Sequence, residues 1–98
     1  MLSKKARLTS AEVREILKSG RSVRLGTLSA KYVISAHSKA AVVVSAKVAK
    51  NAVERNRLRR AAYRVLRASL PKGVRVVFFL HKPALDPLEL SSLCLKLS

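Results

Sequence analysis

The sequence predicts a single α+β domain over residues 1–98, in which a sheet of about four strands carries helices in a two-layer packing. Three observations predict it. Amphipathic segments with helix-capping residues stand near both ends and near the middle of the chain, and segments rich in β-branched residues stand between them. No repeat or linker-like stretch divides the chain, whose 98 residues suffice for one modest core. The expected order is α-β-β-β-α-β-α.

The first helix is predicted from its N-terminal cap. Thr9 and Glu12 have the T-x-x-E spacing of a capping box, in which each residue satisfies a backbone N–H of the other. Gly20 marks the expected end of the helix, because glycine commonly terminates helices. The expected apolar face consists of Val13, Ile16 and Leu17.

Residues 21–48 are expected to form two or three strands. The stretches "SVRLGTL", "KYVIS" and "KAAVVVSAKVA" are rich in β-branched residues and are separated by short polar turns. The run Val42-Val43-Val44 is apolar on both faces of a strand, which favours a central strand over an edge strand. A further strand, "VRVVFFLHK", follows the turn "PKG".

The last helix is predicted to begin at Asp86 and Pro87. An acidic cap, a proline at the first helical position and Glu89 at the third are typical of a helix start. Cys94 is the only cysteine, which excludes an intrachain disulfide, and we interpret it as a small core residue. The expected buried stripe consists of Leu90, Leu93, Cys94 and Leu97.

The charge balance predicts a polyanionic partner. The chain has 21 basic and 5 acidic residues, a formal net charge of +16. Such a surface attracts nucleic acid in a salt-dependent manner, while a merely basic surface or an anionic membrane is the less favoured interpretation. The N-terminus lacks the apolar core of a signal peptide, and the longest apolar run, "VRVVFFL", is too short to span a bilayer. We therefore expect a cytoplasmic protein.

The acidic residues and histidines do not predict an active site. Four of the five acids stand at predicted helix N-termini, and Glu15 suits an ordinary surface pair. His37 and His81 are far apart in the sequence and have no Asp or Cys nearby, so a solvated or phosphate-facing role is favoured over a catalytic pair. We expect no catalytic residue and no metal site in the protein, which then acts by binding.

The helix predicted over about 52–69 is the main candidate site. Seven Lys and Arg side chains fall within residues 50–67. The expected buried arc consists of Leu58, Ala61, Ala62 and Val65, with Leu66 at its margin. The expected exposed face consists of Asn56, Arg60, Tyr63 and Arg67, flanked by Arg57, Arg59 and Arg64. Arginine forks suit phosphates, Tyr63 offers stacking to an unpaired base, and Lys47 and Lys50 extend the basic surface. A solvated charged face is the alternative.

The stretch "SAKVAKNAVERNRLRRAAYRVLR", with "RLTSAEVREILKSGR" before it and "FFLHKPALDPLELSSL" after it, resembles the protein subunit of bacterial ribonuclease P. The resemblance covers nearly the whole chain. Its centre is an Arg-Asn-Arg signature at Arg55, Asn56 and Arg57, followed by Leu58, Arg59, Arg60 and Arg67 at the family's spacing. It implies the same element order and a left-handed β-α-β crossover around the arginine-rich helix.

The resemblance also implies a division of labour. In that family a catalytic RNA removes the 5′ leader of precursor tRNA with Mg²⁺, and the protein is a non-catalytic subunit that carries no cofactor of its own. The protein binds the catalytic RNA around its Arg-Asn-Arg helix and holds the leader in a cleft between the first helix and the sheet. The implied partners are therefore the catalytic RNA and precursor tRNA, with no membrane and no obligate protein partner.

The chain departs from the family pattern in the implied leader cleft. Two aromatics one turn apart are usual in the first helix, and Val13 and Leu17 occupy those places. Either these two residues line the cleft or they belong to the core. Tyr32 is a possible remaining stacking residue, although an aromatic in a strand is by default packing. Tyr63 stands where another arginine is usual, and the glycine before the helix is replaced by Ala49.

Two other classes of function stay open at this level. A structural ribosomal protein would share the basic surface, and it would co-purify with ribosomal subunits in high salt. A metal-independent ribonuclease would use His37 or His81 and would cleave RNA without an RNA subunit.

Overall fold

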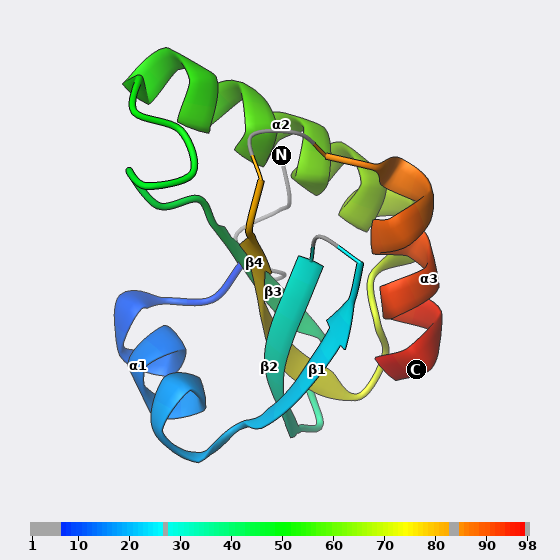
Figure 1. The fold of residues 1–98 in the computed structure, drawn as a ribbon. Helices are drawn as coiled ribbons and strands as arrows, with labels where there is room; N and C mark the ends of the chain where they lie inside the picture. The colour runs from blue at the N-terminus through cyan, green and yellow to red at the C-terminus, as the bar shows by residue number, and fades with distance from the viewer. Residues whose placement is uncertain (1–6, 27, 83–84, 98) are drawn as a thin grey trace.

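The computed structural model describes residues 7–26, 28–82 and 85–97. Its elements follow the order α1 (Ser10–Ser19), β1 (Arg21–Leu25), β2 (Leu28–Ile34), β3 (Lys39–Val43), α2 (Ala52–Ser69), β4 (Val74–Leu80) and α3 (Pro87–Leu97). The α+β class and the predicted α-β-β-β-α-β-α order are thereby confirmed (Figure 1).

The four strands form one sheet with the order β1-β2-β4-β3. β2 pairs antiparallel with β1 and with β4, whereas β3 and β4 are parallel, so α2 is the crossover between two neighbouring parallel strands. The left-handed sense of this crossover stays a prediction. Within "SVRLGTL" the chain turns rather than continuing as one strand, because Gly26 has a φ of 60° and Leu25 pairs with Leu28.

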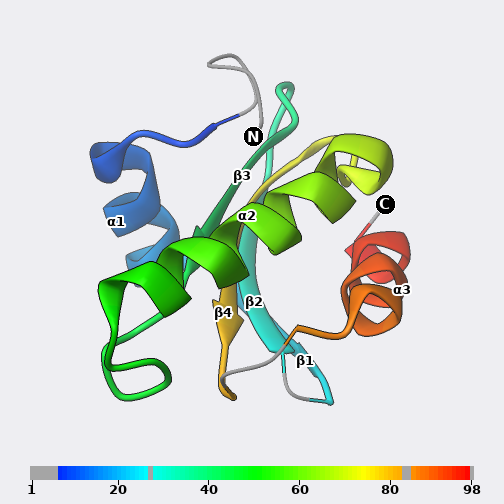
Figure 2. The same cartoon turned by 90° about the horizontal axis from the view of Figure 1, so that it is seen from above.

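Helices lie on both faces of the sheet, so that α1 adds a partial layer to the predicted packing of helices on one sheet. The core face carries Ala30, Val76 and Phe78 and packs against α2 and α3. α1 lies on the other face, where the Lys31 ammonium donates to the carbonyl of Leu17 over 3.3 Å. Figure 2 shows α1 and α3 on opposite sides of the strands. The alternation of apolar side chains did not reveal this, because α1 covers its face only in part.

The core face holds the main hydrophobic cluster. Phe78, Leu66, Leu90 and Leu93 are fully buried, and the predicted stripe of α3 is confirmed. In α2 the buried residues are Leu58, Ala62 and Leu66, while Ala61 and Val65 are only half-buried. The predicted arc was therefore displaced: Leu66 is central rather than marginal, because α2 packs against α3 as well as against the sheet.

The prediction of a central strand at Val42-Val43-Val44 is wrong, because β3 lies at the edge of the sheet. Val42 and Val44 are buried, but Val43 is 36% exposed on the α1 side. Other parts of the chain satisfy the edge backbone. The Val42 N–H donates to the Tyr63 hydroxyl over 3.2 Å, and the Leu8 N–H donates to the Ala40 carbonyl over 3.2 Å. These contacts let an apolar strand occupy an edge without a row of unpaired groups.

The predicted caps of α1 are confirmed. Thr9 and Glu12 form the capping box, with distances of 3.1 and 3.2 Å, and Gly20 caps the C-terminus through a bond to the Ile16 carbonyl. Among the helices of the described ranges, none combines the length and the apolar character that crossing a membrane requires.

Candidate nucleic-acid interface

α2 is a capped helix of 18 residues that carries six arginines and one glutamate. Asn51 caps it, accepting the Val53 N–H over 2.8 Å. Leu58, Ala62 and Leu66 recur every four residues and fix one side of the helix against the core. Because the burial of this side dictates the orientation of the whole helix, the positions of the arginines follow from it.

Four exposed arginines form a stripe on the side of α2 opposite the core, which we call the arginine stripe: Arg57, Arg60, Arg64 and Arg67. Their spacings of three, four and three residues place them on one face. Arg57 has one partner, Glu54, at 3.1 Å, an exposed pair that contributes little stability. Arg60, Arg64 and Arg67 make no side-chain hydrogen bond or ion pair with the described residues, so this face carries nearly uncompensated positive charge.

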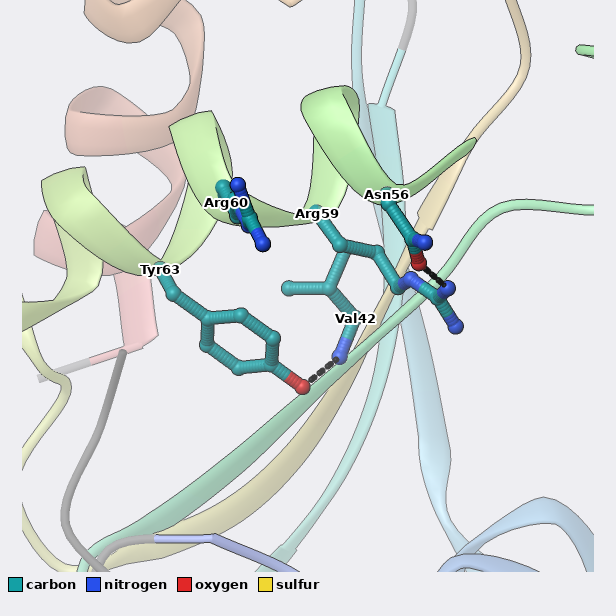
Figure 3. A pocket seen from close by; sticks show the side chains of 5 residues that line it. All are labelled: Val42, Asn56, Arg59, Arg60 and Tyr63. Atoms are coloured by element: carbon teal, nitrogen blue, oxygen red, sulfur yellow. Dashed lines mark hydrogen bonds between the residues drawn. The ribbon is translucent and has the colours of Figure 1, made fainter. Parts of the chain in front are cut away.

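Tyr63 does not lie on the exposed face as predicted. Its ring packs half-buried against the core cluster, and its hydroxyl accepts the Val42 N–H of β3. Asn56 accepts a hydrogen bond from the Arg59 guanidinium on the same flank (Figure 3). Together with Val42 and Arg60 these residues line an open cavity of 390 Å³. The helix is thus rotated by less than one residue step of about 100° relative to the predicted orientation.

Arg55 lies on the inner flank of α2 rather than in the stripe. Its guanidinium donates to the carbonyls of Ala49 and Lys50 over 2.9 and 3.1 Å and so closes the connection from β3 to α2. Lys47 and Lys50 are exposed in this connection, as predicted from the sequence. The signature arginines thus have two roles in the fold, since Arg55 shapes the connection and Arg57 is displayed to solvent.

The α1 side of the sheet forms a second basic surface, which we call the open face. It holds a cavity of 340 Å³ lined by Ser22, Val23, Arg24, Ser29, Ala30, Lys31, Phe79 and His81. Ser29 and His81 lie 2.7 Å apart between the hydroxyl oxygen and Nε2. Neither Phe79 nor Arg24 was among the predicted site residues. The sequence could have indicated Phe79, because side chains alternate between the two faces of a strand and Phe79 lies between the core residues Phe78 and Leu80.

Two of the three predicted leader-cleft residues lie on α1. Val13 is half-buried and Leu17 is 39% exposed, while the fully buried residue of this helix is Ile16. Tyr32 lies on the other side of the sheet, in the alternation of Leu28 and Ala30, and packs against the core cluster. Tyr32 is therefore not a residue of the α1 side, which corrects its assignment to the cleft.

The two histidines cannot act as a pair. His37 follows β2, at the end of the sheet where Ile34 pairs with Val74, and His81 follows Leu80 at the other end of β4. Seven strand residues separate these ends, roughly 20 Å at the rise of a β-strand. Among the described residues, no three His, Cys, Asp or Glu side chains are grouped so that they could hold a metal ion.

The Glu12 carboxylate contacts three other residues of the fold. The Thr9 N–H holds the pKa of its carboxyl below the ordinary value, burial opposes this, and the charges of Lys39 and Arg75 reinforce it. The distances from the carboxylate are 3.5 Å to Lys39 and 3.4 Å to Arg75. This acid therefore joins α1 to two strands and is not available for chemistry.

The fold and these two surfaces define a small, strongly basic α+β protein with two exposed basic surfaces. A family model described as Ribonuclease P matches residues 2–97. The chain belongs to the Ribonuclease P family, so the resemblance in the sequence is confirmed. Family membership connects the chain with ribonuclease P and tRNA processing.

Solved structures share the fold. The ribonuclease P protein of Thermotoga maritima superimposes with a TM-score of 0.80 at 21% identity, covering 94% of this chain and 97% of that one. The Staphylococcus aureus protein gives 0.75 at 22% identity, with coverages of 96% and 93%. A Staphylococcus aureus mutant with defective mRNA degradation activity gives 0.76 at 20% identity, with coverages of 96% and 86%. No curated protein matches the chain significantly.

Proposed function

We propose that this chain is the non-catalytic protein subunit of ribonuclease P, which promotes removal of the 5′ leader from precursor tRNA by a catalytic RNA. The arginine stripe binds the catalytic RNA, and the open face together with α1 holds the single-stranded leader. Mg²⁺ is supplied to the RNA of the holoenzyme, and the protein works in the cytoplasm. The proposal rests on family membership together with the observation that carries it, the uncompensated arginine stripe.

The chemistry of the stripe supports an RNA partner. Guanidinium groups donate to phosphate oxygens in a planar fork, and four of them on one helix face span several phosphates. With one acid in the entire helix, the stripe repels cations and gains energy by replacing the counterions of a polyanion. The cavity beside Asn56 and Tyr63 adds hydrogen-bonding groups that suit an unpaired base.

The distribution of the acids supports catalysis by the RNA. Glu12 is bound to Thr9, Lys39 and Arg75, and Glu54 pairs with Arg57. The Asp86 carboxylate accepts the Leu88 N–H at the start of α3 over 2.9 Å. These three carboxylates already have partners within the fold, and RNA phosphates are hard oxygen ligands of the kind that Mg²⁺ prefers, which favours a metal-dependent hydrolysis on the RNA.

The test is multiple-turnover cleavage of precursor tRNA by the cognate RNA at low Mg²⁺, with and without the protein. Wild-type protein is expected to raise the rate, whereas the protein without RNA gives no cleavage. Arg60→Ala is expected to weaken binding of the RNA about fivefold, since a typical hydrogen bond contributes roughly 1 kcal/mol. The logarithmic salt dependence should also become shallower by roughly 0.7 to 0.9 for each phosphate that the variant no longer neutralises.

Lys96→Ala is the matched control, because Lys96 is an exposed cation on a different helix, α3. Equal losses of RNA affinity in Arg60→Ala and Lys96→Ala would show that the arginine stripe contributes only non-specific positive charge. Failure of the wild-type protein to stimulate the RNA would overturn the proposal and, with co-sedimentation on ribosomal subunits in high salt, would indicate a ribosomal protein. RNA-free cleavage that is lost in His81→Ala or His37→Ala would place catalysis in this chain.

A further inference from the structure

We propose that Phe79 is a base-stacking residue of the open face, where its ring supports one nucleotide of a single-stranded RNA segment. The inference rests on the proposed function, because it assigns a contact within the surface that holds the leader. It goes beyond that function by naming a residue from β4, whereas the sequence had pointed to α1 and to Tyr32.

The other three aromatic rings are committed to the core face. The sequence has two Phe, two Tyr and no Trp. Phe78 is fully buried, and Tyr32 and Tyr63 pack against the same cluster. Phe79 is half-buried, does not belong to that cluster and lines the cavity of the open face. Phe79 is therefore the one Phe or Tyr ring available for a stacking contact on the α1 side of this sheet, and the imidazole of His81 lines the same cavity beside it.

The register of the strands surrounds Phe79 with suitable neighbours. Phe79 pairs with Val43 of β3 and with Ser29 of β2, and Ser29 in turn pairs with Arg24 of β1. These four residues form one row across the sheet on the α1 side. Lys31 lies on the same side two residues along β2 from Ser29 and lines the same cavity. An apolar ring thus lies between a valine and two cations, an arrangement that accepts a base on the ring and its phosphates on the cations.

α1 leaves this row uncovered. Glu12 of α1 binds Lys39 and Arg75 at the opposite part of the sheet, and the Leu17 carbonyl accepts from Lys31, which is two residues along β2 from Ser29. Arg75 precedes Phe79 by four strand residues, which is about 13 Å along β4. Val43, the register partner of Phe79, is 36% exposed, whereas Val77, which lies between Arg75 and Phe79 on β4, is fully buried. The change from buried Val77 to accessible Val43 and Phe79 marks where the cover by α1 ends.

The row of residues around Phe79, which we call the platform, also carries polar groups at its edge. His81 follows β4 directly, and its Nε2 lies 2.7 Å from the Ser29 hydroxyl, so this pair borders the ring at the end of the strand. Stacking itself tolerates any base, because every base has a π-face. The platform is therefore expected to favour an unpaired nucleotide over an abasic one, with little preference for base identity.

The experiment measures the affinity of the holoenzyme, made from this chain and its cognate RNA, for precursor tRNAs whose leader carries a single abasic site at each position in turn. Phe79→Leu keeps the apolar bulk and removes the ring, and Phe79→Tyr keeps the ring. Phe78→Leu is the matched control, because the same substitution one residue earlier falls on the core face. Melting temperatures of all variants are recorded in parallel.

Phe79→Leu is expected to weaken binding of the intact leader about tenfold, in line with the stacking contribution of one base. At one leader position the abasic substrate should bind wild type and Phe79→Leu equally, since the base that the ring supports is gone. Phe79→Tyr should retain wild-type affinity, and Phe78→Leu should lower the melting temperature without changing the abasic profile.

Two different failures are distinguishable. If wild-type holoenzyme gains affinity from the leader but Phe79→Leu has the same abasic profile, Phe79 is not the stacking residue and this inference is overturned. If the wild-type protein confers no leader-dependent affinity at all, the proposed function fails before Phe79 is tested. A tenfold loss in Phe79→Leu that is the same for every abasic substrate also overturns the inference, because it shows a structural effect.

Discussion

The two faces of the sheet show how one set of strands supports both stability and recognition. On the core face Val76, Phe78 and Leu80 pack under α2 and α3, and their side chains are almost fully buried. On the α1 side the alternate residues of the same strand are Arg75, Val77 and Phe79, of which only Val77 is fully buried. The first face is held by extensive apolar burial, and the second by the burial of Ile16 and Val77 together with polar contacts.

Partial cover makes the second face available to a partner. α2 and α3 together seal the part of their face that β4 forms, although Ile34 at the end of β2 is 85% exposed on the same side. α1, by contrast, has 10 residues and one fully buried side chain, Ile16. Glu12 adds polar attachment to the burial of Ile16 through its contacts with Lys39 and Arg75. The uncovered remainder keeps cations and one ring at the surface, as an RNA-binding surface requires.

The largest expected effect is the difference in stability loss between substitutions of Phe78 and of Phe79. Phe78→Ala should lower the free energy of unfolding by about 3–5 kcal/mol, because it opens a cavity in a sealed core. Phe79→Ala should lower it by about 1 kcal/mol, since its ring is already half in water. Urea unfolding of both variants measures the difference. Equal losses would show that the α1 side is as tightly packed as the core face.

An intermediate effect is expected from Glu12. Because the folded pKa of Glu12 is lowered, its stabilising contribution is present above pH 4.5, its ordinary pKa, and is lost as the pH falls through the folded value. Glu12→Ala should cost about 1–2 kcal/mol near neutral pH, from the cap and the two ion pairs. Glu12→Gln should cost less, because an amide oxygen can still accept the Thr9 N–H.

Hydrogen exchange of α1 as a function of pH measures this effect. In wild type the amides of α1 should lose protection below pH 4.5 before those of α2, and in Glu12→Gln this difference should shrink. Simultaneous loss of protection in both helices would show that the two faces of the sheet are not held differently.

The smallest expected effect concerns Cys94, on the sealed side. Burial raises the pKa of its thiol to about 11, so only about one thiol in a thousand is ionised at pH 8. A thiol reagent should label native protein slowly and unfolded protein rapidly. Rapid labelling under native conditions would show that the contact between α2 and α3 opens readily.

Sequence reasoning was most successful for local features. The caps at Thr9 and Asp86, the end of α1 at Gly20 and the burial of α3 depend on residues within a few positions of one another. The same holds for the basic character of α2, in which four of the six arginines are exposed on the side opposite the buried apolar residues. The family resemblance was also correct, since its motif lies within one continuous stretch.

Sequence reasoning failed where partners come from distant parts of the chain. The apolar run at Val42 suits an edge strand only because Tyr63 and the segment before α1 meet its backbone. Tyr63 was placed on the exposed face because the rotation of α2 depends on α3, which lies beyond β4 in the chain. Alternation along β4 places Phe78 and Phe79 on opposite faces of the sheet, but it does not show which of the two faces is covered by helices.

The elements, their order, the family and the positive charge of α2 could therefore be obtained from the sequence alone, because capping, periodicity and charge act over short stretches of chain. The strand order, the division of the sheet into a sealed and an open face, and the positions of Arg55, Tyr63 and Phe79 emerged only in the folded chain. The physical reason is that these features depend on which distant segments bury each other's apolar surface, and this choice is made by the packing of the whole chain.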